Sequence, residues 1–78
     1  MADYKKDFLD TVAEQIAYKP LRRVLGQELK EHIYDRTEEY EAQGISREEA
    51  ERQAVRDMGD PVVIGTELNR VHQVQKAP

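Results

Sequence analysis

The side chains best suited to chemistry lie in one predicted helix, where a histidine stands between two carboxylates. His32 follows Glu28 by four positions and precedes Asp35 by three, so the three side chains share a helix face. Two ligands from one helix face can begin a metal site. No third ligand is evident, because His72 is far away in the sequence. We interpret His32 as a hydrogen-bonding surface group and predict neither a metal site nor a cofactor.

Glutamates gather around the turn between the second and third predicted helices. They are Glu38, Glu39, Glu41, Glu48, Glu49 and Glu51. General acid–base catalysis needs a desolvated carboxyl group in a cleft, whereas the corner of a helical hairpin is well hydrated. The sequence also lacks a nucleophile beside a base, a phosphate-binding glycine loop and a zinc-protease motif. We therefore predict no catalytic residues, no small-molecule substrate and no enzymatic activity.

Size and composition indicate a single domain that comprises residues 1–78. The chain has no cysteine, which is typical of a reducing compartment, and its net charge is −4. An acidic surface gains nothing from neutralising phosphates, so a nucleic-acid partner is not expected. No apolar run reaches the ~18–20 residues that span a bilayer, and no signal peptide is evident. These features predict a soluble, cytoplasmic domain.

Apolar periodicity predicts four helices, at about 4–17, 21–42, 47–58 and 61–72. The second is the longest, with an apolar stripe of Leu21, Leu25, Leu29 and Ile33. The segment 18–20 ends the first helix, because it leads into a proline. The fold class is therefore all-α: a compact bundle of four helices with the second as its spine. The residues expected to be buried are Val12, Leu25, Leu29, Ile33 and Leu68.

Between the last three predicted helices lie two short segments whose residues end one helix and begin the next. Gly44 ends the second helix, and Ser46 caps the third, with Glu49 placed to complete a capping box. Gly59 suits a left-handed position after a helix end. The pair Asp60-Pro61 then supplies a cap and a first helical residue. These residues predict a helical hairpin followed by a sharp corner.

Two further glycines fall inside predicted helices. Gly26 and Gly65 each cost ~1 kcal/mol relative to alanine in a helix interior. A close crossing of two helices would explain them, and a hinge or a contact with a partner is the alternative.

Together these caps, stops and core positions resemble the permease prefix domain, a small helical module of Gram-positive bacteria. The resemblance covers about residues 18–72. The residues that carry it are Glu28-Leu29, His32-Ile33, Asp35, Gly44, Ser46, Glu49-Ala50, Met58-Gly59-Asp60-Pro61, Ile64-Gly65 and Leu68. It implies a cytoplasmic N-terminal domain ahead of membrane-spanning segments, tethered to the inner face of the membrane. In proteins with this module, the membrane-spanning part is that of a permease-like protein or of a polytopic cell-wall polymerase of the shape, elongation, division and sporulation family. The resemblance supplies no active site.

The charges of the second helix run against its macrodipole, with basic residues at its start and acidic residues at its end. In an up-and-down bundle the arginines of the third helix would return beside that basic start. We therefore predict a docking patch, formed by Lys19, Arg22, Arg23, Arg52 and Arg56. Its partner would be an acidic protein, the acidic corner of another copy, or anionic lipid. A merely solvated, screened face is the alternative.

Tyr34 and Tyr40 form the alternative docking surface, since their spacing does not fit one buried stripe. The predicted function is a non-catalytic accessory domain of a multi-pass membrane protein, which it regulates or scaffolds by protein–protein docking. Its partner would be its own membrane domain, another subunit or a second copy. The alternative is a free-standing helical adaptor, or a transcription-associated regulator, that dimerises. The gene sequence after Pro78 distinguishes the two.

Overall fold

The computed structural model describes residues 3–75 and contains four helices within them. They are α1 (Tyr4–Glu14), α2 (Lys19–Ala42), α3 (Arg47–Met58) and α4 (Pro61–Gln75). No strand occurs among the described residues. The predicted all-α class and the role of α2 as the longest, central helix are confirmed.

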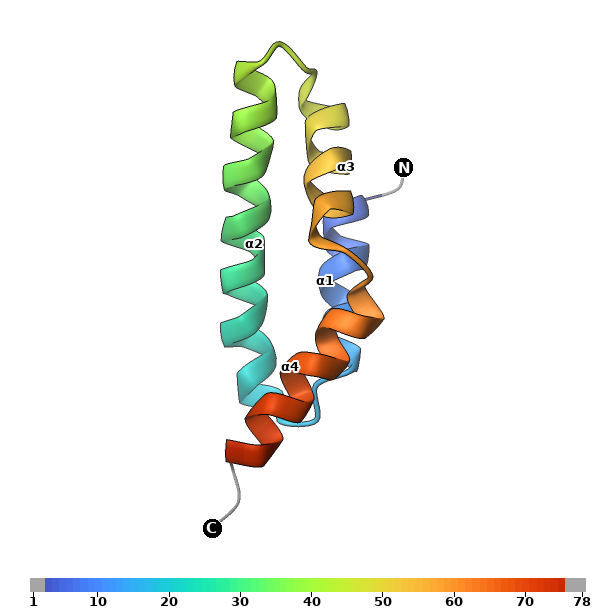
Figure 1. The fold of residues 1–78 in the computed structure, drawn as a ribbon, viewed down its shortest axis with the longest axis vertical. Coiled ribbons are helices and arrows are strands. Elements are labelled where there is room, and N and C mark those ends of the chain that lie inside the picture. Colours follow the sequence, from blue (N-terminus) through green and yellow to red (C-terminus); the bar gives the residue numbers. More distant parts are fainter. Residues whose placement is uncertain (1–2, 76–78) are drawn as a thin grey trace.

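The helices form an elongated bundle, with dimensions of 50 × 23 × 18 Å. Helices α2 and α3 lie side by side as an antiparallel hairpin (Figure 1). Helix α1 packs against α2 and α3, and α4 packs mainly on α1. Because α3 has 12 residues and α2 has 24, α3 covers only the second half of α2. Helix α1 begins beside α3 and runs toward the other half of the molecule, where α4 lies (Figure 1).

The core is built mainly from α1 and α2. Its large buried side chains are Phe8, Val12, Ile16, Leu25 and Ile33. Two alanines of α3 complete it, and their small side chains let α3 approach α2 closely. The predicted burial of Val12, Leu25 and Ile33 is confirmed.

Two predicted core residues, Leu29 and Leu68, are only half-buried at the edge of this core. Helical spacing correctly placed them on the inner side of their helices. However, α3 ends at Met58 and does not extend over the first half of α2, so Leu29 is covered on fewer sides.

Three helix ends differ from the sequence prediction. Helix α1 ends at Glu14 and not at 17, because the next two backbone amides donate to carbonyls three residues back and tighten the turn. Helix α2 begins at Lys19 and not at 21, since Pro20 fits the first turn, where its missing N–H is not needed. Helix α4 continues to Gln75, because no glycine or proline stops it at 72.

The turn between α2 and α3 follows the predicted stop and start. Gly44 has a φ of +95°, and its amide donates to the Glu41 carbonyl at 2.9 Å. The Ile45 amide donates to the Tyr40 carbonyl at 3.2 Å, which completes a Schellman motif. The Ser46 hydroxyl then accepts from the Glu49 amide at 3.4 Å, as a helix cap does.

The corner between α3 and α4 also matches its prediction. Gly59 has a φ of +102°, which side-chain-bearing residues rarely adopt. The Asp60 carboxylate accepts from the Val62 amide at 2.9 Å, and Pro61 is the first residue of α4. The corner turns the chain so that α4 can cross α1.

Of the two glycines inside helices, only Gly65 lies at a close crossing. A β-carbon on Gly65 would be 2.6 Å from the Val12 carbonyl oxygen and 2.8 Å from the Gln15 β-carbon. A β-carbon on Gly26 would meet nothing within 4 Å. The close-crossing explanation therefore holds for Gly65 and is wrong for Gly26.

Candidate functional site

The five residues of the predicted docking patch do not lie together. An Arg36–Asp57 ion pair, with an N–O distance of 2.6 Å, links the end of α3 to the second half of α2. Arg23 precedes Arg36 by thirteen positions, which is about 20 Å along a helix. Arg52 and Arg56 therefore stand well away from the basic start of α2. The short α3 is the reason, because it ends before it can reach that start.

At the start of α2 the three basic residues have different surroundings. The Arg22 side chain donates through Nε to the Ile16 carbonyl oxygen at 2.7 Å and ties the connection after α1 to α2. This structural role has no signal in the sequence. Lys19 and Arg23 are exposed and make no hydrogen bond or ion pair with the residues that the structure describes.

Arg52 of α3 contacts Tyr4, the first residue of α1. The Arg52 guanidinium donates to the Tyr4 hydroxyl at 3.2 Å, and its central carbon lies 4.9 Å from the centre of the Tyr4 ring. A second nitrogen lies 3.5 Å from the Glu49 carboxylate. The Arg52 Nε is shielded from solvent and has no partner among the described residues. These contacts hold the Arg52 guanidinium in one orientation.

Arg56 follows on the same side of α3, one helical turn later. It is exposed and forms no ion pair with a described residue. With Tyr4, Arg52 and Val55 it lines a shallow hollow of about 370 Å³. We call these four residues the Arg52–Arg56 surface. Two guanidinium groups beside a phenol and an apolar floor suit a carboxylate, which accepts paired N–H···O bonds.

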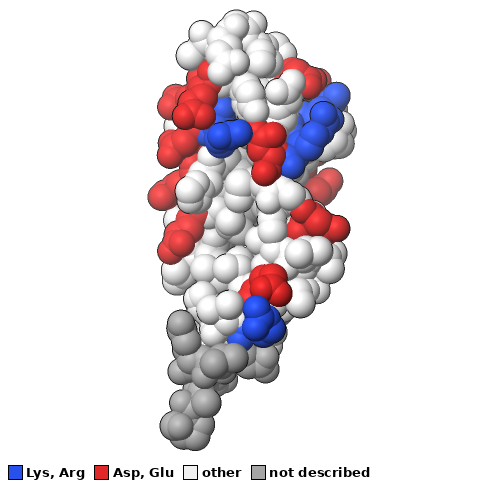
Figure 2. Space-filling model, viewed as in Figure 1, with Lys and Arg blue, Asp and Glu red and all other residues white. Residues whose placement is uncertain are grey.

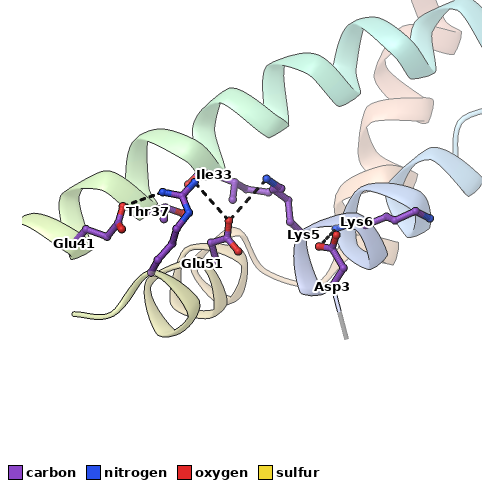
Figure 3. A network of polar contacts seen from close by, with 8 residues as sticks. Asp3, Lys5, Lys6, Ile33, Thr37, Glu41 and Glu51 are labelled. Carbon is purple, nitrogen blue, oxygen red and sulfur yellow. Dashed lines mark hydrogen bonds and ion pairs between the residues drawn. The ribbon is translucent and has the colours of Figure 1, made fainter. Parts of the chain in front are cut away.

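A larger hollow of about 710 Å³ lies on the other side of the Tyr4–Arg52 pair, and an ion-pair network crosses it. Figure 3 shows Glu51 of α3 reaching both Lys5 of α1 and Arg47, with N–O distances of 3.9 and 4.0 Å. Arg47 also contacts Glu41 of α2 at 3.3 Å. The acidic corner predicted to be solvated is thus partly cross-linked between helices. Exposed pairs of this kind contribute little stability each, so their effect is to orient side chains.

The two tyrosines of the alternative docking surface are also separated. The Tyr40 hydroxyl donates to the Asp57 carboxylate, which also accepts from Arg36. The Arg36 guanidinium and this hydroxyl hold the pKa of Asp57 below its usual value, and the carboxylate raises the pKa of Tyr40. Tyr40 therefore joins α2 to α3, and sequence reasoning missed this clamp because Asp57 belongs to another helix.

Tyr34 is exposed and lines a separate hollow of about 280 Å³ between α1 and α2. The nearby Glu38 carboxylate raises the pKa of the Tyr34 hydroxyl. Tyr34 and Tyr40 thus have different neighbours and do not form one continuous surface.

His32 lies exposed on α2. Among the described residues, no group of three histidine, aspartate or glutamate side chains is placed to hold a metal ion. The described helices include none with the length and apolarity needed to cross a bilayer.

Comparisons with protein-family models, with curated proteins and with solved structures gave no match to this chain. The resemblance to the permease prefix domain therefore stays a prediction from the sequence. The candidate site rests on the geometry of the Arg52–Arg56 surface.

Proposed function

We propose that this chain is a non-catalytic cytoplasmic accessory domain of a multi-pass membrane protein, which it regulates or scaffolds by docking to a protein. The Arg52–Arg56 surface is the observation that carries the proposal. Arg36, Arg47 and Arg70 each form an ion pair within the described chain. Arg56 forms none there and is exposed beside a tyrosine and a second arginine.

The composition of this surface favours docking over catalysis. Arginine and tyrosine are enriched at protein interfaces, where they often contribute most of the binding energy. Arg52 is held in place by Tyr4 and Glu49, so little side-chain freedom is lost when a partner binds. The described carboxylates near it are half-buried and paired with basic groups, which does not suit proton transfer in a cleft.

The link to a membrane protein is supported by the sequence resemblance and is compatible with the shape of the bundle. The last turns of α4 lie at the same end of the molecule as the start of α2, opposite the α2–α3 turn (Figure 1). A chain that continued from α4 toward a membrane would leave the Arg52–Arg56 surface at the side of the domain, open to a partner.

The first test is the gene sequence that follows Pro78. We expect several hydrophobic segments of membrane-spanning length after it. A stop codon directly after Pro78 would contradict the proposal and favour the free-standing helical adaptor.

The second test is cross-linking in cells that express the parent protein. We expect Arg56→Glu to remove cross-links between this domain and its partner. Arg23→Glu is the matched control, because it makes the same charge change at an exposed residue far from the surface. Docking through this surface is wrong if Arg56→Glu retains every cross-link, or if Arg23→Glu removes the same ones.

A further inference from the structure

We propose that the partner of the Arg52–Arg56 surface is a second copy of this chain, which presents the acidic outer face of its α2. This inference rests on the docking role proposed above for that surface, and it names the partner. Both halves of the contact are present in one chain, and their charges are complementary.

The acidic half is a row of exposed carboxylates along α2. Its residues are Glu28, Glu31, Asp35, Glu38 and Glu39, all exposed. Their spacing of three, four and one places them on one side of the helix, within about a third of its circumference. Of the nearby cations of α2, Arg36 pairs with Asp57, whereas Lys30 lines the hollow beside α1 together with Glu31 and Asp35. We call this row the acidic α2 face.

The two halves lie on different sides of the bundle. Figure 2 shows carboxylates along the edge formed by α2, at the left of the view. In the upper part of the view, lysine and arginine side chains form one group between α2 and α3, next to these carboxylates, and another at the opposite edge, with carboxylates beside both groups. One copy can therefore place its Arg52–Arg56 surface on the acidic α2 face of a neighbour, which leaves its own acidic α2 face and the neighbour's Arg52–Arg56 surface free. Such a contact is heterologous, so it builds rings or open chains and not only pairs.

The salt concentration affects the attraction at this contact and the overall repulsion between copies differently. Each copy carries a net charge of −4, so copies repel one another at long range. At 0.1 M salt the Debye length is about 10 Å, which screens distant charges and leaves contacting pairs partly intact. At 1 M it is about 3 Å, and exposed pairs are also weakened. Association through these surfaces is therefore strongest at moderate ionic strength.

The test is sedimentation equilibrium of the purified 78-residue chain at about 0.1 M and about 1 M salt. We expect the weight-average mass to rise with concentration at the lower salt and to stay near that of one chain at the higher salt. Arg56→Glu alone, and Asp35→Lys alone, should each weaken self-association at least roughly tenfold, since each places like charges together. Both positions are exposed, and circular dichroism should show wild-type helix content in both variants.

An equal mixture of the two variants gives the sharpest result. The Arg56→Glu copy still offers an intact acidic α2 face, and the Asp35→Lys copy still offers an intact Arg52–Arg56 surface. The mixture should therefore form one-to-one complexes, although neither variant self-associates. Arg23→Glu, the matched control, should associate as the wild type does. A mixture that stays monomeric, a wild type that stays monomeric, or an Arg23→Glu variant as weak as Arg56→Glu would each overturn the inference.

The two proposals fail in different ways. If the wild type is monomeric in solution while Arg56→Glu still removes cross-links in cells, the partner is another protein, and only self-association is wrong. If the variants complement each other in solution while the gene shows no membrane segments, the accessory role in a membrane protein is wrong and self-association stands.

Discussion

The molecule consists of two helix pairs that are joined in different ways. Helices α2 and α3 are neighbours in sequence, with a four-residue connection, and polar contacts brace their hairpin at both ends. The Arg47 network lies near the turn, and the Arg36–Asp57–Tyr40 clamp lies at the far end of α3. Helices α1 and α4 come from opposite ends of the chain and meet through a backbone contact at Gly65.

The difference shows which substitutions each helix pair can tolerate. In the α2–α3 pair, charged side chains can change with little loss of stability, because they lie at the surface, outside the buried residues that join the two helices. In the α1–α4 pair a single methyl group added at Gly65 would clash with the Val12 carbonyl oxygen and the Gln15 side chain. Changes of exposed, unpaired charged side chains on the hairpin, such as Arg56, should therefore alter binding, whereas a change at Gly65 in the crossing should alter folding.

The largest expected effect is at Ile33, which is fully buried where α1 and α3 both pack on α2. Ile33→Ala should lower the free energy of unfolding by ~2–5 kcal/mol, the range for a buried aliphatic residue. Urea denaturation followed by circular dichroism measures this loss. Leu29→Ala, at a half-buried position, is the matched control and should lose clearly less. Equal losses would mean that the core is not centred on Ile33.

A pair of glycine substitutions tests the crossing of α1 and α4. Gly65→Ala should destabilise the domain by roughly 1–3 kcal/mol, because its β-carbon would clash with the Val12 carbonyl and the Gln15 side chain. Gly26→Ala should stabilise it by roughly 0.5–1 kcal/mol, since alanine favours a helix and the space is open. Thermal melts of both variants provide the measurement. A stabilising Gly65→Ala would show that α1 and α4 do not meet as described.

The clamp at the end of the α2–α3 hairpin predicts a smaller effect that depends on pH. Arg36 lowers the pKa of Asp57 in the folded state below its usual value near 3.8. The clamp therefore contributes stability above that usual pKa, and the contribution is lost as the pH falls through the lowered, folded-state pKa. Asp57→Asn should reduce stability at neutral pH and flatten the decline in acid. If the wild type and Asp57→Asn lose stability in parallel between pH 5 and pH 2, the clamp does not act in solution.

The hairpin could be predicted from the sequence to a much greater extent than the crossing. Gly44, Ser46 and Gly59 act through contacts within a few residues, so their roles follow from local rules. The pairing of α1 with α4 depends on residues far apart in the sequence, such as the Ala17 amide and the Asn69 side chain, 2.9 Å apart. The sequence singled out Gly65 as a crossing point but not Val12 as its partner.

The candidate site was predictable only in part, for the same reason. Arg52 and Arg56 were chosen for their charge, but their position depends on where α3 ends along α2. Tyr4 was not included, because nothing near it in the sequence places it under Arg52. Local charge patterns therefore identified two of the four residues, and the packing of α1 on α3 was needed for the others.

The most direct test of the account measures stability and association together for Arg56→Glu. Arg56 is exposed and forms no ion pair with a described residue, so its reversal should leave the free energy of unfolding within about 0.5 kcal/mol of wild type. The same change should weaken the salt-sensitive association of the purified chain at least roughly tenfold. A variant that unfolds more easily but still associates would contradict the account, because Arg56 would then serve the fold and not a partner.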